Sequence, residues 1–166
     1  LNDVLDYSKI EAGRMTLEQV PFQLSACLAG VAGLFEFQCR EKGLGWQLQV
    51  PADLPDWLVG DPLRLEQILT NLLLNALDAV ASAPGERRVE VRAEPSPDGA
   101  EIILRVADSG PGVPEPHLDR IFDPFFTTKK QEGTGLGLSI SYAIIQRYGG
   151  RISVESAPGE HTTFTL

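Results

Sequence analysis

The order of the secondary-structure patterns in this 166-residue chain predicts an α+β fold, a two-layer sandwich in which a mixed, mostly antiparallel sheet packs on one layer of helices. Two observations favour it over a doubly wound parallel sheet. Helical periodicity and strand-like alternation fall in separate stretches rather than in regular βαβ units. The strands also come in pairs with short connections, as at 87–94 and 101–108, which are joined through Pro97, Asp98 and Gly99.

The chain begins with a pattern typical of one amphipathic helix over residues 1–18. Its apolar stripe is narrow, like the seam of a coiled coil, and consists of Leu1, Leu5, Ser8, Ala12 and Met15. Such a stripe is expected to pack on the chain's own domain or on a partner helix. Pro21 and Phe22 then indicate a break and a short extended piece.

The next stretch predicts a helix, a strand and a loop. Ser25 is predicted as the N-cap of a helix that runs to about Lys42, where glycines end it. Alternating apolar and polar residues predict a strand at 46–50, and two prolines predict a loop at 51–60.

The helix predicted from Asp61 to about residue 81 carries two stripes, of which the apolar one is expected to face the core. The other stripe is polar, and its spacing puts all of its members on one side of the helix: Gln67, Asn71, Asn75 and Asp78. A further helix is predicted at 135–148, followed by a closing hairpin at 151–156 and 162–166.

The composition limits the classes of function. A net charge of −9 argues against broad electrostatic binding to nucleic acid or to an anionic membrane surface. No apolar run reaches the ~18–20 residues of a membrane-spanning helix, and no signal-peptide pattern is visible. Cys27 and Cys39 lie about 18 Å apart along one predicted helix, too far for a disulfide. We therefore expect a cytoplasmic chain, and the sequence leaves open an inner-membrane anchor elsewhere in a longer parent protein.

Two segments combine polar side chains in patterns that suit ligand binding. Asn71 and Asn75 share one helix face although asparagine is a poor helix former, and their oxygens suit Mg²⁺ and phosphate. A solvated face is the alternative. Asp108-Ser-Gly-Pro-Gly112 follows an apolar strand. It suits a carboxylate that accepts a hydrogen bond from an exocyclic amine beside closely approaching backbone, and a plain turn is the alternative.

Two more segments belong to the Gly- and Pro-rich stretch 109–133 and its continuation, which is long enough to be functional. Gly133-Thr-Gly-Leu-Gly-Leu138 opens a helix, so its backbone can approach a phosphate at the helix N-terminus. Its spacing is neither G-x-G-x-x-G nor a P-loop. Phe122-Asp-Pro-Phe-Phe-Thr-Thr-Lys129 combines aromatic rings with cations, which suits either the hinge of a lid or a plug of local core.

Together, in this order, the four segments resemble the N box, first glycine box, F box and second glycine box of the catalytic domain of two-component sensor histidine kinases, a family related to the gyrase and Hsp90 ATPases. The closing Gly159-Glu-His-Thr-Thr-Phe164 is similar to that family's last turn and strand. Leu5-Asp-Tyr-Ser-Lys-Ile-Glu-Ala-Gly13 is similar to the end of the dimerisation helix, most like hybrid kinases. The resemblance thus divides the chain into 1–18, the end of the dimerisation helix with its linker, and 19–166, the ATP-binding catalytic domain.

The resemblance implies ATP and Mg²⁺ as ligands, with residues 109–133 as a long ATP lid that Phe122, Phe125 and Phe126 would seat. Asp108 would accept from the adenine amino group, with Gly110 and Gly112 shaping the pocket. Asn75 would hold Mg²⁺ with the triphosphate, assisted by Asn71. The further nucleotide-binding positions that the resemblance implies are Asp78, Ile121, Phe122, Lys129, Gly133, Thr134, Gly135, Leu136, Gly137, Leu138 and Thr162.

The implied reaction is transfer of the γ-phosphoryl group of ATP to a histidine of the dimerisation domain, for relay to an aspartate of a response-regulator receiver domain. Asn71, Asn75 and Lys129 would act in this transfer, and Lys129 would replace a cation that many family members carry at the position of Asp78. The implied partners are the protein's own dimerisation domain and a receiver domain, in a homodimeric parent.

The phosphoacceptor histidine is expected upstream of this chain. Its two histidines, His117 and His161, lack the acidic context of a phosphoacceptor and are interpreted as ordinary surface residues. We therefore expect the chain to bind ATP without phosphorylating itself.

Two other functions stay open. A gyrase- or Hsp90-type ATPase carries a glutamate at the position of Asn71 as a general base for water, so asparagine favours phosphoryl transfer over hydrolysis. A module that has lost nucleotide and acts through protein contacts is the second alternative, although every expected nucleotide position is filled here.

Overall fold

The structure, a computed structural model, describes residues 2–81, 83–128 and 133–166. Its helices are α1 (Asn2–Glu11), α2 (Leu24–Glu41), α3 (Pro62–Ala81), α4 (Glu115–Leu118) and α5 (Gly137–Arg147). Its strands are β1 (Val20–Gln23), β2 (Gly45–Gln49), β3 (Trp57–Gly60), β4 (Arg88–Pro95), β5 (Ile102–Asp108), β6 (Ser153–Ala157) and β7 (His161–Thr165).

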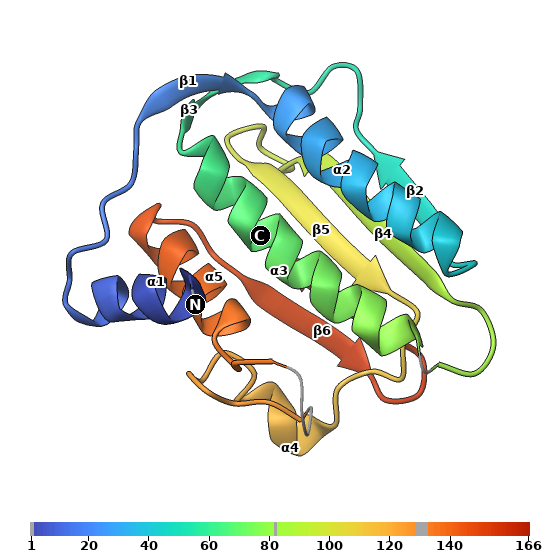
Figure 1. Ribbon diagram of the computed structural model, residues 1–166. Helices are drawn as coiled ribbons and strands as arrows, with labels where there is room; N and C mark the ends of the chain where they lie inside the picture. The colour runs from blue at the N-terminus through green and yellow to red at the C-terminus, as the bar shows by residue number, and fades with distance from the viewer. Residues whose placement is uncertain (1, 82, 129–132) are drawn as a thin grey trace.

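The main sheet has the strand order β2-β4-β5-β7-β6. Only the β2–β4 pair is parallel among these described strands, and the other neighbouring pairs are antiparallel. Helices α2, α3 and α5 lie side by side on one face of the sheet (Figure 1). The predicted α+β sandwich with a mixed, mostly antiparallel sheet is therefore confirmed.

The core lies between the sheet and the helices, with α3 at its centre. Leu69, Leu72 and Val80 of this helix have no exposed surface, because the apolar stripe seen in the sequence faces the strands. On the sheet side, β4 contributes Val89 and Ala93, which are also fully buried. The packing fixes the rotation of α3 about its own axis and with it the direction of the polar stripe.

Strand β5 brings an acidic residue to the helix-covered face of the sheet. Its alternation places Leu104, Val106 and Asp108 on the buried side. Asp108 is the last residue of the strand, so its carboxylate lies where the sheet ends beside α3. The strand was predicted at 101–108, and the structure confirms that end point.

A two-stranded ribbon was missed in the sequence. Residues 57–60 were predicted as part of a loop, but they form β3, which pairs antiparallel with β1 so that Pro21 faces Val59. The prolines that predicted the loop, Pro51 and Pro55, both precede the strand. The short pattern of β3 carries little signal without its partner, which is 36 residues away along the chain from Pro21 to Trp57.

The prediction that Ser25 caps α2 was wrong. The N-cap residue is Gln23, which makes no side-chain capping bond, and α2 begins at Leu24. The cap comes from elsewhere: Asp56 Oδ1 accepts from the Ser25 backbone N–H at 2.8 Å, and the Asp56 carbonyl accepts from the Leu24 N–H at 2.8 Å. An acceptor so distant in sequence could not be found from local capping patterns.

Helix α1 is shorter than predicted, since it ends at Glu11 rather than at residue 18. Gly13, with a φ of 66°, takes the left-handed conformation that stops a helix. Met15 then enters the core with 3% exposure, which an uninterrupted helix would not allow.

The predicted apolar stripe of α1 is not the side that packs on the domain. Leu5 is 55% exposed, whereas Asp6 forms an ion pair of 2.8 Å with Arg64 at the start of α3. The Tyr7 ring meets Phe125 edge to face, with 5.4 Å between ring centroids. Polar and aromatic contacts therefore attach α1 beside α5 and α3 (Figure 1).

Both cysteines, Cys27 and Cys39, are buried and free of disulfides, as predicted. Burial raises the pKa of the Cys27 thiol to about 11. Across the described part of the chain, no helix combines the length and apolar character that crossing a membrane requires.

Asp61 caps α3, as predicted, and also holds the segment that leads into β1. Its Oδ1 accepts from the Arg64 backbone N–H at 3.1 Å, and its Oδ2 accepts from the Glu18 N–H at 3.2 Å. The Tyr148 hydroxyl accepts from the Asp61 backbone N–H at 2.7 Å, which ties this junction to the end of α5. The side chain is buried, so its two acceptor roles are not shared with solvent.

Replacing Asp61 with alanine is expected to lower the free energy of unfolding by about 1–2 kcal/mol, because two backbone N–H groups lose their acceptor. In thermal unfolding this should lower the midpoint by roughly 3–6 °C. Asp53→Ala, in an exposed loop, is the matched control and should leave the midpoint unchanged. Equal midpoints for the two variants would contradict the capping role.

Candidate functional site

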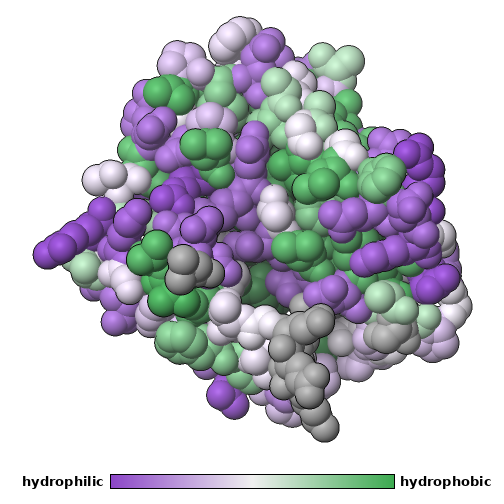
Figure 2. Space-filling view, in the orientation of Figure 1, coloured by the Kyte–Doolittle hydropathy of each residue, from purple (hydrophilic) through white to green (hydrophobic). Residues whose placement is uncertain are grey.

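A cavity of about 880 Å³ opens between α3, the start of α5 and the segment that runs from Pro111 to Thr128. This volume is that of a small-molecule site. In Figure 2 the surface is hollowed near the centre of the view, and both hydrophilic and hydrophobic side chains surround the hollow. The described residues of the cavity come from five separate stretches of sequence, so only the fold brings them together.

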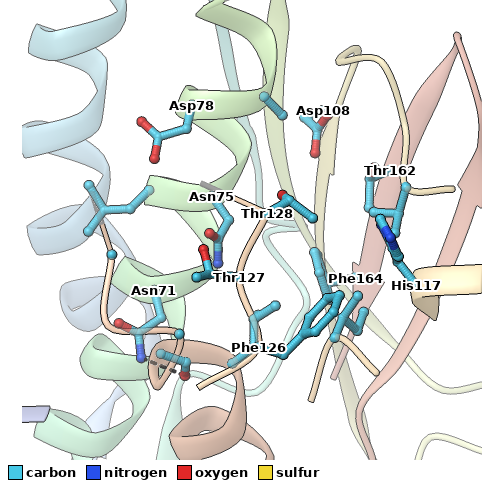
Figure 3. A pocket seen from close by; sticks show the side chains of 18 of the residues that line it. Asn71, Asn75, Asp78, Asp108, His117, Phe126, Thr127, Thr128, Thr162 and Phe164 are labelled. Atoms are coloured by element: carbon cyan, nitrogen blue, oxygen red, sulfur yellow. Dashed lines mark hydrogen bonds between the residues drawn. The ribbon is translucent and has the colours of Figure 1, made fainter. Parts of the chain in front are cut away.

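The wall on the α3 side is polar. Asn71, Asn75 and Asp78 line the cavity, on successive turns of the helix (Figure 3). Gln67, the fourth member of the predicted stripe, lies one turn earlier and donates instead to Asp6 of α1 at 2.8 Å. Asn71, Asn75 and Asp78 of the stripe therefore line the cavity, whereas Gln67 helps to attach α1.

The carboxamide of Asn71 has a fixed orientation. Its Nδ2 donates to the backbone carbonyl of Gly137 at 3.0 Å and to Ser141 Oγ at 3.2 Å, both in the first turns of α5. Gly137 permits this approach, because a Cβ there would lie 3.3 Å from the Asn71 carboxamide carbon. With the amide nitrogen used to join α3 to α5, Oδ1 is the atom left for a ligand.

The opposite end of the cavity is formed by β5 and β7. Asp108 and Thr162 are direct cross-strand partners, and both are nearly fully buried. Asp108 Oδ1 accepts from the Gly110 N–H at 2.8 Å, which leaves Oδ2 for other partners. Burial raises the pKa of Asp108 to about 6, with smaller opposing effects from the Gly110 hydrogen bond and from His161.

Two glycines permit backbone contacts that no other residue would. A Cβ on Gly112, which has a φ of +71°, would lie 2.4 Å from the carbonyl oxygen of Ala157. A Cβ on Gly135, with a φ of +66°, would lie 2.6 Å from the carbonyl carbon of Phe125. The first contact holds the start of the 111–128 segment against the end of β6. The second holds Phe125, later in the same segment, against the glycine-rich stretch 133–138.

The start of α5 has the character of an anion site. Its N-cap residue, Leu136, makes no side-chain capping hydrogen bond. The side chain at this position therefore satisfies none of the backbone N–H groups of the first turn. The helix dipole adds positive potential there. Gly133, Thr134 and Gly135, which precede α5, line the adjoining wall.

The 111–128 segment covers the cavity mainly with apolar groups. Phe126 lies on the cavity wall, with the Arg120 guanidinium 4.7 Å from its ring centroid. Phe122 turns away and packs on Tyr142 and Phe164, with centroids 5.4 and 6.4 Å apart. Phe125 is 63% exposed. The three rings therefore have different surroundings instead of forming one plug.

His117 is not the ordinary surface residue that the sequence predicted. It lines the cavity, its ring lies 5.5 Å from that of Phe126, and its buried Nδ1 has no hydrogen-bond partner among the described residues. His161, by contrast, is exposed at the start of β7. Its local sequence does not reveal that His117 lines the cavity.

Most of the predicted nucleotide-binding positions lie on this cavity. Those on its wall are Asn71, Asn75, Asp78, Asp108, Gly112, Ile121, Gly133, Thr134, Gly135, Gly137, Leu138 and Thr162. Gly110, Phe122 and Leu136 lie behind the wall and support it, Leu136 with no exposed surface. Lys129 lies outside the described residues.

Several wall residues were not predicted individually as nucleotide-binding positions. They are Asp3, Leu74, Ala79, Pro111, Val113, Pro114, His117, Phe126, Thr127, Thr128 and Phe164. Leu74 and Ala79 follow from the helical periodicity of the predicted stripe, because they flank it. Asp3, whose carboxylate lies 3.5 Å from Thr134 Oγ1, carries no sequence signal for this position.

Comparisons with known proteins agree with this geometry. A model of the family described as histidine kinase-, DNA gyrase B- and HSP90-like ATPases matches residues 60–166. The chain belongs to this family.

Its curated relatives include sensor kinases. The signal transduction histidine-protein kinase BarA of Escherichia coli (strain K12) is 40% identical over 169 residues, which cover 99% of this chain and 18% of BarA. The aerobic respiration control sensor protein ArcB of the same strain is 34% identical over 171 residues, covering 99% of this chain and 21% of ArcB. The chain thus spans about a fifth of the length of these relatives.

Solved structures give the same assignment. Full-length ShkA, crystallised with AMPPNP, matches 99% of this chain and 34% of its own with a TM-score of 0.85 and 32% identity. A nucleotide-free catalytic domain of the histidine kinase ThkA matches 90% of this chain and 95% of its own with a TM-score of 0.74 and 33% identity. This chain is the ATP-binding catalytic domain of a two-component sensor histidine kinase.

The raised pKa of Asp108 makes the stability of this catalytic domain depend on pH. Below the ordinary pKa of 3.8 the carboxyl is protonated in both the folded and unfolded states, so it contributes no difference. Above the folded-state pKa of about 6 it is ionised in both, and the folded state bears the full cost of burying the charge. The contribution of Asp108 to stability therefore falls as the pH rises between these values.

Asp108→Asn is expected to raise the free energy of unfolding of the ligand-free domain by about 1–3 kcal/mol at neutral pH, because the amide carries no charge to desolvate. Denaturant titrations at several pH values measure this difference. It should shrink to zero at about pH 4, and the exposed Asp53→Asn serves as the control. A variant less stable than the wild type at neutral pH would contradict the desolvation of Asp108.

Proposed function

We propose that the cavity holds Mg²⁺-ATP with the adenine at the Asp108–Thr162 end and the phosphates between α3 and the start of α5. The observation that carries this proposal is the opposite chemistry of the two ends. One end offers buried acceptors, Asp108 and Thr162, which suit an exocyclic amine. The other offers a helix N-terminus and carboxamides, which suit phosphate and its cation.

The donor set suits Mg²⁺ only together with the nucleotide. The described residues contain no group of three or more His, Cys, Asp or Glu side chains that could hold a metal. Mg²⁺, however, is commonly held by one or two protein oxygens, water and substrate phosphates. The Asn75 oxygen would hold the ion, with Asp78 one turn further along the same wall. The ion would neutralise phosphate charge, which matters in a chain with a net charge of −9.

Asn71 supports phosphoryl transfer rather than hydrolysis. Its Nδ2 is held by Gly137 and Ser141, and the remaining Oδ1 is a neutral acceptor that cannot take up a proton from water as a carboxylate does. The work of the domain is then to position the γ-phosphoryl group and to stabilise its charge. Lys129 is proposed to add a cation to this end.

The acceptor is proposed to be a histidine outside this chain, on the dimerisation domain, of which residues 1–18 would be the end of the helix and its linker. His117 belongs to the 111–128 segment and lines the cavity, and His161 is exposed at the start of β7, next to Thr162. Neither lies beside the Asn71–Asn75 wall, where the γ-phosphate is placed. The chain alone is therefore expected to bind ATP without phosphorylating itself.

The proposed route then continues to a response-regulator aspartate, in a homodimeric parent. Histidine kinase ThkA has been crystallised in complex with the response regulator protein TrrA. That chain matches 98% of this one with a TM-score of 0.73 and 27% identity. The similarity supports a receiver domain as the partner of this protein as well.

Calorimetric titration tests the nucleotide site. ADP and a non-hydrolysable ATP analogue are expected to bind the wild type saturably, and Mg²⁺ should tighten binding of the analogue. Asp108→Asn should weaken both ligands by about tenfold or more, since the amide presents a donor as well as an acceptor to the adenine amine. Asn75→Ala should instead remove most of the Mg²⁺ dependence.

The same titration separates the alternatives. Asp53→Asn, with unchanged binding, shows that the loss is specific to the cavity. A well-folded wild type that binds neither ligand would overturn the proposal and favour a module acting through protein contacts. Steady release of inorganic phosphate from ATP, unaffected by any histidine acceptor, would favour a gyrase-type ATPase.

A further inference from the structure

A row of polar side chains crosses three neighbouring strands at the Asp108–Thr162 end of the cavity. This end, where the adenine base is proposed to bind, is called the base end. Asp108 of β5 is paired with Thr162 of β7, and Thr162 is paired with Ser156 of β6. Directly opposed residues in antiparallel strands share a face, so all three lie on the same side of the sheet. Asp108 and Thr162 line the cavity, and Ser156 lies next to Thr162 on the neighbouring strand.

The hydroxyl of Ser156 has its full set of hydrogen bonds. It donates its single proton to the carbonyl oxygen of His161 at 2.9 Å, because a carbonyl can only accept. It accepts from the Val113 backbone N–H at 2.7 Å. The remaining contact is with Thr162 Oγ1, at 3.1 Å.

This arrangement fixes the direction of the last hydrogen bond. Because the Ser156 proton is already donated to His161, the Thr162 hydroxyl has to donate to Ser156. Thr162 then has no proton to offer to the cavity and presents only lone pairs. The neighbouring Asp108 carboxylate, when ionised, also only accepts.

We propose that Ser156 is a positioning residue for base specificity: it keeps the Thr162 hydroxyl turned away as a donor, so that the base end recognises a 6-amino purine and rejects a 6-oxo purine. The inference rests on the proposed function, since it concerns nucleotide binding in the same cavity. The amino group of adenine, directly or through one water, can donate to both acceptors. The carbonyl oxygen of hypoxanthine or guanine at the same position meets lone pairs instead.

Ser156 has a second role that must be separated from the first. Through the Val113 N–H it holds the start of the 111–128 segment, beside the Gly159 N–H to Pro111 carbonyl bond of 2.6 Å. Loss of this anchor would weaken every nucleotide alike. Loss of the control over Thr162 would change the ratio of affinities for two bases. The ratio is therefore the readout that a purely structural role leaves unchanged.

The experiment measures dissociation constants of ADP and of inosine diphosphate, which differ at the purine 6-position, for the wild type and Ser156→Ala. In the variant, Thr162 is free to rotate and donate to a carbonyl oxygen. The preference for ADP is expected to fall by about three- to tenfold, the size of one hydrogen bond. Ser156→Thr, which keeps the hydroxyl, should retain the wild-type preference. Thr163→Val, on the opposite face of β7, is the matched control.

A double-mutant cycle shows whether Ser156 acts through Thr162. In a Thr162→Val background, Ser156→Ala should leave the preference unchanged within about twofold, because no hydroxyl remains to be turned. If Ser156→Ala does not fold, Ser156→Cys, which keeps the shape but bonds weakly, is expected to lower the preference as well.

Two results would contradict these proposals, and each points to a different one. If both nucleotides weaken equally in folded Ser156 variants, the specificity role is overturned and Ser156 only anchors the segment. If the wild type binds neither nucleotide, the proposed function itself fails before any variant is compared.

Discussion

The packing of α3 across the sheet is the interaction on which the rest of the structure depends. Leu69 and Leu72 are fully buried against the strands, and burying each side chain of this kind contributes about 1.5–3 kcal/mol. That packing permits only one rotation of the helix about its axis. The same rotation turns Asn71 and Asn75 into the cavity, where the Asn71 amide fastens the start of α5. The core and the phosphate end of the site are thus two sides of one helix.

The base end lowers the stability of the ligand-free domain, and the packing of the core compensates for this loss. Asp108 is held on the buried face of β5, with a pKa raised to about 6 because its charge is poorly solvated. Away from that end, beside Gly135, Phe125 has a φ of 64°, a left-handed conformation that costs a non-glycine residue about 1–2 kcal/mol. Its backbone nevertheless stays against Gly135, since no side chain intervenes there. Polar groups placed for a ligand therefore stand at a cost to the ligand-free fold.

The N-terminal helix completes the surroundings of the site. Asp3 lies on the cavity wall beside Thr134, and Tyr7 contacts the exposed ring of Phe125. The Asp6–Arg64 ion pair fastens the same helix to the beginning of α3. Segments that the sequence resemblance assigns to two different parts of the protein thus meet at one edge of the cavity. The matched family model begins at residue 60 and therefore does not include this helix.

The sequence by itself determined the sandwich, the span of α3 with its Asp61 cap, the free cysteines and the family, since these follow from local periodicity and from motifs in a fixed order. It also named about half of the residues of the cavity wall. Tertiary structure alone decided the β1–β3 ribbon, the cap that Asp56 supplies to α2, and the places of His117 and Asp3 on the cavity wall. It alone showed how Ser156 orients Thr162. The physical reason is that hydrogen bonds and packing between residues far apart along the chain leave no periodic mark in the sequence, whereas burial of one face of a helix or strand does.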